Sequence, residues 1–170
     1  MKRILVTGAA GFVGSEVVRH LLDLGKAVTM LDRNQPDIDA EFVRADLSEP
    51  STLGSLNREF DCIIHFASLP GDTGDPWQMV TVNVGGCVTI LEYARKTRAG
   101  RFVLASSISA YEWYPGTVFC PPDYLPVDEN HPCRPKDIYS TSKRIQELLV
   151  LTYYFQYRLP AVILRMTAII

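Results

Sequence analysis

Two side chains with complementary acid–base chemistry stand four residues apart in the second half of the chain. Tyr139 and Lys143 form Tyr-x-x-x-Lys at the start of a predicted helix, and this spacing places both on one helix face. A nearby ammonium favours the phenolate and would lower the tyrosine pKa from about 10. Such a tyrosine can exchange a proton with a substrate hydroxyl or carbonyl. The motif alone is weak evidence, because it recurs by chance on many helices.

A hydroxyl group precedes this pair along the chain. Ser106 and Ser107 close a predicted strand at residues 102–105, and ligands of open α/β sheets bind at the carboxyl ends of the strands. We therefore expect Ser107 to face the same crevice and to hydrogen-bond the reacting oxygen. The alternative is an ordinary strand-ending turn, in which serine is common.

A glycine-rich turn near the N-terminus is typical of dinucleotide binding. Thr7 to Gly14 reads T-G-x-x-G-x-x-G between a predicted strand and a predicted helix. Gly8 permits the tight turn, Gly11 lets the backbone approach a pyrophosphate, and Gly14 lets the helix pack close to the sheet. The helix N-terminus then offers free N–H groups to the phosphates. A turn without ligand is the alternative, but the flanking strand and helix favour cofactor binding.

The second predicted strand ends in an acidic residue that bears on cofactor choice. Asp32 suits the two hydroxyls of a ribose and would repel a 2′-phosphate. Arg33 beside it could pair with that phosphate instead, or be a solvated surface residue. We predict NAD, with NADP less favoured, because Asp32 holds the strand-end position.

The predicted elements alternate between strand and helix, and the strands are continuously apolar. This pattern indicates an α/β fold with a doubly wound parallel sheet covered on both faces. We expect one NAD(P)-binding Rossmann domain over residues 1–170, cut short after the sixth strand. The predicted strands are 2–7, 27–31, 41–45, 62–66, 102–105 and 161–165, and the predicted helices are 12–24, 51–58, 76–98 and 139–157.

Composition excludes several other classes of protein. The net charge is -2 without a basic run, so neither nucleic acid nor a membrane surface is an expected partner, and no apolar stretch is long enough to span a bilayer. Four cysteines without a Cys-x-x-Cys pair, and without histidines at ligand spacing, predict no metal site and a reduced, cytoplasmic location.

Together these motifs resemble the extended short-chain dehydrogenase/reductase family. This is the group of NAD-dependent sugar epimerases and dehydratases, of which UDP-glucose 4-epimerase is the best-known type. The family's further motifs match Asp46-Leu47, His65-Phe66-Ala67 followed by Ser68, Asn83-Val84-Gly85-Gly86 with Cys87 in place of threonine, and Ser106 to Tyr111. The chain departs from the family at Glu112, where glycine is expected, and lacks an asparagine shortly after Arg165.

The resemblance implies a role for each matched residue. Tyr139 would be the acid/base, Lys143 its electrostatic partner and ribose contact, and Ser107 the contact to the substrate oxygen. The implied cofactor-binding residues are Gly8, Gly11, Phe12, Val13, Gly14, Asp32, Arg33, Asp46, Leu47, Phe66, Ala67, Ser68, Asn83, Tyr139 and Lys143. Phe66 and Ala67 could instead be core, Asp46 a loop cap and Asn83 a helix-surface residue, and we expect His65 to be a packed strand residue.

The resemblance also implies an activity and an assembly. The expected reaction is hydride transfer at a hydroxyl carbon of a sugar or nucleotide-sugar. The alternatives are an NAD-binding or regulatory module without catalysis, and a sugar-acid dehydrogenase of the uronate type. The family's substrate lobe is missing here. A homodimer is expected through the helices at 76–98 and 139–157, with Leu148, Leu149 and Tyr153 as apolar contacts that could equally be core.

Overall fold

The computed structural model describes residues 2–54, 56–71, 75–111 and 121–167. Six strands form one parallel sheet in the order β3-β2-β1-β4-β5-β6. The strands are β1 (Arg3–Thr7), β2 (Ala27–Asp32), β3 (Glu41–Arg44), β4 (Cys62–His65), β5 (Phe102–Ser107) and β6 (Ala161–Met166). The predicted doubly wound parallel sheet is thereby confirmed.

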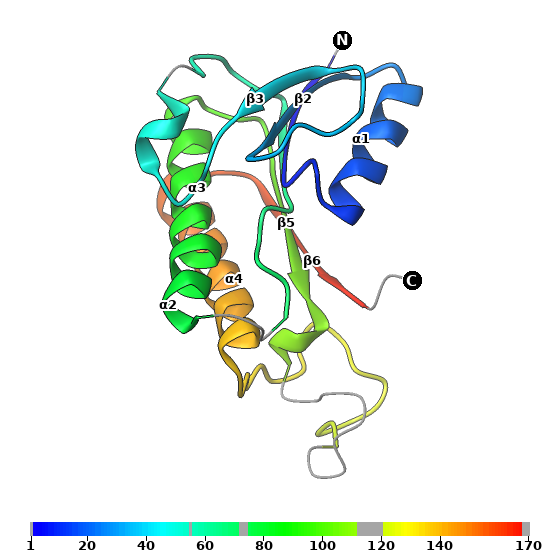
Figure 1. Ribbon diagram of the computed structural model, residues 1–170. Helices are drawn as coiled ribbons and strands as arrows, with labels where there is room; N and C mark the ends of the chain where they lie inside the picture. The colour runs from blue at the N-terminus through cyan, green and yellow to red at the C-terminus, as the bar shows by residue number, and fades with distance from the viewer. Residues whose placement is uncertain (1, 55, 72–74, 112–120, 168–170) are drawn as a thin grey trace.

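Helices lie on both faces of the sheet. The helical segments are α1 (Phe12–Asp23), η1 (Pro50–Leu53), α2 (Pro76–Met79), η2 (Val80–Gly85), α3 (Gly86–Lys96), η3 (Ile108–Ala110) and α4 (Ile138–Tyr157). Helix α1 lies on one side of the sheet, and α3 and α4 run next to each other on the other side (Figure 1). This is the three-layer arrangement that right-handed crossovers between parallel strands produce.

The strand order reverses direction between β1 and β4. The chain moves outward from β1 to β3 in its first third, returns to β4 beside β1, and then moves outward on the other side. Both strands end at the same edge, because Thr7 pairs with His65. Ligand crevices of open α/β sheets form at such a reversal, beyond the carboxyl ends of the strands.

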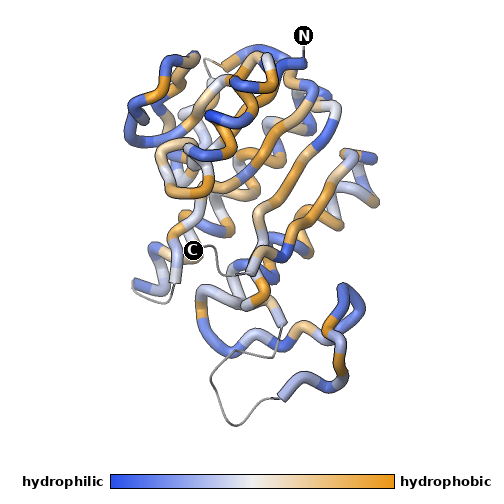
Figure 2. Tube along the Cα trace, turned by 90° about the vertical axis from the view of Figure 1, so that its right-hand side faces the viewer, coloured by the Kyte–Doolittle hydropathy of each residue, from blue (hydrophilic) through white to orange (hydrophobic). Residues whose placement is uncertain are grey.

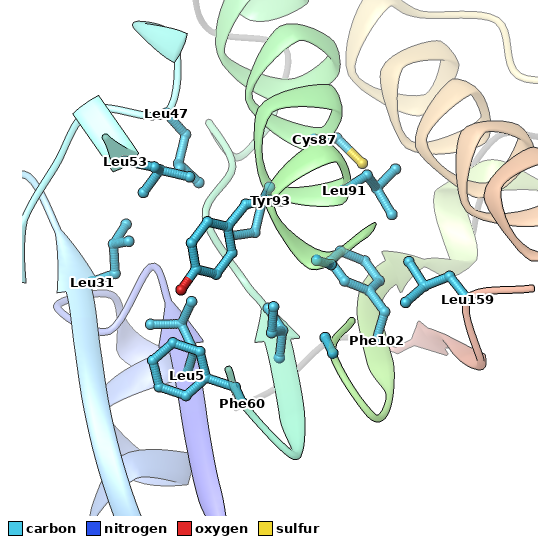
Figure 3. Close-up of a cluster of buried hydrophobic side chains, with 14 of the residues drawn as sticks. Leu5, Leu31, Leu47, Leu53, Phe60, Cys87, Leu91, Tyr93, Phe102 and Leu159 are labelled. Atoms are coloured by element: carbon cyan, nitrogen blue, oxygen red, sulfur yellow. The ribbon is translucent and has the colours of Figure 1, made fainter. Parts of the chain in front are cut away.

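Two apolar clusters hold the layers together. The larger cluster packs the sheet against α3 and α4, and Figure 3 shows Leu5, Leu91 and Phe102 from three elements converging in it. The smaller cluster, which includes Val6, Val18 and Met30, seats α1 on the opposite face. The hydropathy colouring of Figure 2 follows this arrangement, with apolar strands running through the centre of the molecule.

Three predicted elements differ from the structure. The helix expected over 51–58 is a 3-10 turn at Pro50–Leu53. The helix expected over 76–98 contains a π-helical turn, Val80–Gly85, between two α-helical pieces. Strand β5 continues through Ser107, because its last residues still pair with β6 up to Met166.

The segment before α4 is an ordered loop where the structure describes it. Residues 121–137 contain no helix or strand, but His131 is buried between the rings of Tyr111 and Tyr124. The Nε2 atom of His131 accepts a hydrogen bond from the Asp123 N–H at 2.9 Å. Glu112 lies outside the described residues. None of the described helices has the length and apolar character needed to cross a membrane.

Candidate functional site

The glycine turn joins β1 to α1 with the backbone in close contact. Gly8 has a φ of +70°, and a Cβ built there would lie 2.5 Å from the Ala67 nitrogen. A Cβ on Gly14 would lie 2.1 Å from the Gly8 carbonyl oxygen. Only glycine fits either position. The helix therefore starts directly against the turn, with its N-terminal N–H groups at the strand ends.

Asp32 braces the same turn from the end of β2. One carboxylate oxygen accepts the Ala10 N–H at 3.1 Å, and the other accepts the Asn34 N–H at 3.1 Å. A carboxylate oxygen can accept more than one hydrogen bond, so Asp32 retains acceptor capacity toward the cleft that it lines.

A cleft of about 270 Å³ opens beside the glycine turn, where the strand order reverses. The predicted residues that line it are Gly8, Gly11, Asp32, Arg33, Asp46, Leu47, Phe66, Ala67 and Ser68. Sequence reasoning missed the other lining residues Ala10, Leu31, Asn34, Ala45, Ser48, Leu69 and Val82. An acidic strand end, a glycine turn and apolar walls fit a dinucleotide, whose ribose, pyrophosphate and adenine need those surfaces in turn.

A charged pair borders the cleft between β2 and the segment after β3. The Arg33 guanidinium lies 3.8 Å from the Asp46 carboxylate. Ser48 donates to Asp46 from its hydroxyl at 2.6 Å and from its N–H at 3.0 Å. The Ser48 hydroxyl is the main cause that holds the pKa of Asp46 below its usual value, and Arg33 adds a smaller effect. Aspartate side chains often accept a hydrogen bond from the residue two positions later, so Ser48 could have been noticed from its place after Asp46.

Asn83 does not line the cleft directly. Its side chain is fully buried in the π-helical turn, where it accepts the Leu69 N–H at 2.7 Å and donates to the Leu69 carbonyl at 3.2 Å. The Asn83 amide also lies 3.0 Å from the Ser142 hydroxyl of α4. Asn83 therefore ties the cleft wall at Leu69 to the helix that carries Tyr139 and Lys143.

The Tyr139 and Lys143 side chains lie together on α4, as the four-residue spacing predicts. The Lys143 ammonium is 5.8 Å from the centre of the Tyr139 ring. Lys143 is almost completely buried and donates to the Ala105 carbonyl of β5 at 3.1 Å. Burial lowers the pKa of Lys143 to about 8, because the charged form loses its hydration. Tyr139 is half-buried at the first turn of the helix.

Ser107 stands at the carboxyl end of β5, on which α4 packs. Its hydroxyl donates to the Ser109 hydroxyl at 3.1 Å and accepts the Ser109 N–H at 3.1 Å. Neither Ser107 nor the Tyr139–Lys143 pair is among the residues that line the cleft, and the same holds for Phe12, Val13 and Gly14. Phe12 is largely exposed at the start of α1.

His65 is a packed strand residue, as expected. Its ring is buried against Phe102, and Nδ1 lies 2.7 Å from the Thr7 hydroxyl. Burial, with a smaller contribution from Lys143, lowers the pKa of His65 to about 3, so the imidazole is neutral near pH 7. Over residues 2–54, 56–71, 75–111 and 121–167, no three His, Cys, Asp or Glu side chains gather where they could hold a metal ion.

A buried carboxylate on the same helix escaped the sequence analysis. Glu147 is only 1% exposed and follows Lys143 by one helical turn. It accepts hydrogen bonds from Ser106, Arg144 and Arg165. The four-residue continuation of the Tyr139–Lys143 spacing was the available signal.

The parallel sheet, its reversal point and the glycine turn define a Rossmann-type α/β protein. The model of the NAD dependent epimerase/dehydratase family matches residues 4–170. The chain belongs to this family.

Its relatives within the family catalyse different reactions. The chain is 33% identical to a dTDP-glucose 4,6-dehydratase of Streptomyces antibioticus over 89% of its own length and 48% of that protein. It is 30% identical to the Thermus thermophilus UDP-glucose 4-epimerase solved with NAD, with a TM-score of 0.80 over 96% of this chain and 54% of that one.

A third relative is a mutated uronate dehydrogenase, which is 31% identical with a TM-score of 0.80 over 94% of this chain and 56% of that one. The chain thus spans about half the length of the relatives it matches.

Proposed function

We propose that this chain carries the cofactor-binding half of an NAD-dependent enzyme that transfers hydride at a hydroxyl carbon of a sugar or nucleotide-sugar. The observation that carries the proposal is the cleft at the sheet reversal, which is bordered by the glycine turn and Asp32 and is linked through Leu69 and Asn83 to the helix of Tyr139 and Lys143. Family membership and the solved relatives with NAD support the choice of cofactor.

The residues would share the work according to where they lie. The glycine turn and the N-terminus of α1 would hold the pyrophosphate, Asp32 a ribose, and the Asp46–Leu47 segment the adenine. NAD, when bound, supplies the hydride acceptor. Tyr139 would take the proton from the substrate hydroxyl as the hydride leaves its carbon, and return a proton in the reverse direction. Lys143 would favour the phenolate form of Tyr139, and Ser107 would hydrogen-bond the reacting oxygen.

Asp32 supports NAD over NADP. Its carboxylate lines the cleft at the end of β2, where it would bind a ribose diol and repel a 2′-phosphate. Arg33 also lines the cleft, but Asp46 already lies 3.8 Å from its guanidinium. This pairing reduces the charge that Arg33 offers to a phosphate.

Titration with NADH tests the cofactor proposal. We expect saturable quenching of tryptophan fluorescence with energy transfer to the dihydronicotinamide, displaced by NAD in preference to NADP. Asp32→Ala should weaken NADH binding at least tenfold, whereas Asp39→Ala, an exposed control outside the cleft, should not. Wild-type protein that binds no NADH would refute the proposal, and preferential displacement by NADP would transfer the ribose role to Arg33.

A sugar-acid dehydrogenase is the second candidate, favoured by the likeness to uronate dehydrogenase. Incubation of the full protein with NAD and a panel of uronates and nucleotide-sugars distinguishes the reactions. Net NADH formation with a uronate supports the dehydrogenase, and product without net NADH supports an epimerase or dehydratase. NADH binding without turnover on any of these sugars would support a non-catalytic NAD-binding module.

We further propose that the protein forms a homodimer and that it is located in the cytoplasm. An apolar stripe on α4 is exposed at Leu148, Leu151 and Phe155, and Trp77 of α2 is also exposed. Leu149 and Tyr153 follow the alternative of core residues: Leu149 packs against the core, and Tyr153 is buried with its hydroxyl on Glu92. The free thiols of Cys62, Cys87 and Cys133 fit a reducing compartment.

A further inference from the structure

Glu147 is a buried carboxylate saturated with hydrogen bonds. Oε1 accepts from the Ser106 hydroxyl at 2.6 Å and from Arg165 Nε at 2.9 Å. Oε2 accepts from a second Arg165 nitrogen at 2.9 Å and from Arg144 at 2.8 Å. Burial alone would raise the pKa of Glu147, but these donors outweigh burial and hold the pKa below its usual value. The group is therefore ionised near neutral pH.

Arg144 donates from α4 itself, and the other two donors, Ser106 and Arg165, come from the two strands that end beneath α4. Ser106 and Arg165 are directly paired across β5 and β6, and Glu147 lies over this pair. Ser106 is the neighbour of Ser107, while Glu147 follows Lys143 by one turn and Tyr139 by two turns of α4. Residues at this spacing share one helix face. One carboxylate thus joins the strand end of Ser107 to the helix of Tyr139 and Lys143.

Arg165 extends the connection to the loop at residues 121–137. Its guanidinium lies 4.5 Å from the centre of the Tyr111 ring and donates to the Glu129 carbonyl at 3.2 Å. The Tyr111 hydroxyl donates to the Asp128 carbonyl at 3.0 Å. The loop that leads into Tyr139 is therefore fastened to the same ion pair.

Stability alone does not explain a buried ion pair at this place. Removing two charges from water costs free energy that their attraction often only offsets, and well-packed apolar side chains of similar volume are frequently as stable. A hydrogen-bonded network does fix the relative position of its members, because each donor has one direction in which it is satisfied. Here the members come from the three segments next to the proposed catalytic residues.

We propose that Glu147 is a positioning residue that fixes the strand end of Ser107 and the 121–137 loop against the helix of Tyr139 and Lys143. The catalytic part of this inference rests on the proposed function. The positioning part concerns the protein without ligand and can be measured separately.

Three variants separate positioning from general stability. Glu147→Gln keeps the shape but places an NH2 group among donors. Ser106→Ala removes only the link to β5 and leaves the Arg165 pair intact. Glu92→Gln is the matched control, since Glu92 also accepts from an arginine and from a tyrosine hydroxyl at the interface of α3 and α4, but away from Ser107.

Hydrogen exchange of the full chain, followed by mass spectrometry, is the first readout. In Glu147→Gln we expect exchange at least tenfold faster in peptides covering 104–111 and 121–137, with β1 and β2 unchanged. Ser106→Ala should accelerate only 104–111, and Glu92→Gln only α3 and the end of α4. Unchanged exchange in Glu147→Gln, uniform acceleration over the chain, or no effect of Ser106→Ala at 104–111 would overturn the proposal.

Cofactor binding supplies a second readout that a merely structural residue would not move. Glu147→Gln should bind ADP-ribose within twofold of wild type, but lose most of the fluorescence enhancement of bound NADH, which reports on the nicotinamide end. Full enhancement in this variant would contradict positioning. If the wild-type protein bound no NADH, the proposed function would fail, while the exchange experiment would still decide the role of Glu147.

Discussion

The Lys143 ammonium occupies an interior position that most lysines avoid. Lys143 is 5% exposed, and it donates to a backbone carbonyl at Ala105. Burial disfavours the charged form and lowers its pKa to about 8. The fold therefore keeps a cation beside Tyr139 although this lowers stability. Such an arrangement is common where a charge serves a function.

Replacing Lys143 with Met should make the protein more stable. Burial lowers the Lys143 pKa from 10.5 to about 8, and each pH unit of this lowering corresponds to about 1.4 kcal/mol. After allowance for the lost hydrogen bond to Ala105, we expect the Met variant to gain about 2 kcal/mol of unfolding free energy at pH 7. The unfolded chain holds the lysine proton to about pH 10.5, whereas the folded protein releases it near pH 8. Wild-type stability should thus rise relative to the variant between these pH values.

Urea unfolding of both proteins at pH 7 and pH 10 measures this effect. The difference in unfolding free energy should be large at pH 7 and smaller at pH 10. Lys143→Arg is the control, because arginine keeps its charge across this range. The difference in unfolding free energy between the Arg and Met variants should therefore be the same at pH 7 and pH 10. A Met variant less stable than wild type at pH 7 would mean that the hydrogen bond to Ala105 outweighs the desolvation of the ammonium.

At the scale of single residues, the sequence predicted the features that depend on local spacing, but not those that depend on tertiary contacts. The close-packed glycine turn, the place of Asp32 at a strand end and the shared helix face of Tyr139 and Lys143 were predicted, because each depends on the few residues around it. Glu147 was missed because its partners Ser106 and Arg165 lie 41 and 18 residues away. The burial of Asn83 was missed for a related reason, since its partners at Leu69 and Ser142 belong to other segments.

At the scale of elements, the glycine turn has no space for a side chain at Gly14, whereas the π-helical turn has space for one at Gly85. Gly14 lies in α1 with its Cα against the Gly8 carbonyl, so the helix can approach the turn only without a side chain. Gly85 ends the π-helical turn, and a Cβ built there meets no atom within 4 Å. The two positions form a matched pair for substitution.

Gly14→Ala should destabilise the protein by about 1–3 kcal/mol, because the added methyl group forces the helix away from the turn. Gly85→Ala should instead stabilise it by about 0.5–1 kcal/mol, because alanine has less conformational freedom to lose on folding. Thermal and urea unfolding of the two variants tests both signs. A neutral Gly14→Ala would show that the turn can relax, and would remove the packing explanation for this glycine.

The elements themselves could be predicted from apolar runs, but their ends could not. Strand β5 was placed correctly at its start, yet pairing with β6 extends it through Ser107. The helix at 76–98 was found from its apolar spacing, but the π-helical turn at Val80–Gly85 was not. A π-helical turn holds about one more residue than an α-helical turn and has no composition of its own, so the apolar spacing did not indicate it.

At the scale of the whole molecule, the face formed by α2 and α4 remains apolar after folding. Leu148, Leu151 and Phe155 recur at helical spacing with exposed fractions of 48%, 39% and 66%. Trp77 at the start of α2 is 78% exposed. Isolated exposed apolar residues are ordinary in monomers, but a contiguous stripe of this kind marks an interaction surface.

A second copy of the chain is the occupant that we propose for this face, and a charge placed on it should separate the two copies. We expect light scattering to give twice the mass of the chain for wild type and a single chain mass for Phe155→Glu at the same concentration.

Leu24→Glu is the control, because Leu24 is 55% exposed at the end of α1, on the other side of the sheet. This variant should remain dimeric. Phe155→Glu should keep the wild-type NADH affinity, since Phe155 is not among the residues that line the cleft. A wild-type protein that stays monomeric over a wide concentration range would contradict this assembly, whereas a dimer unaffected by Phe155→Glu would place its interface on another surface.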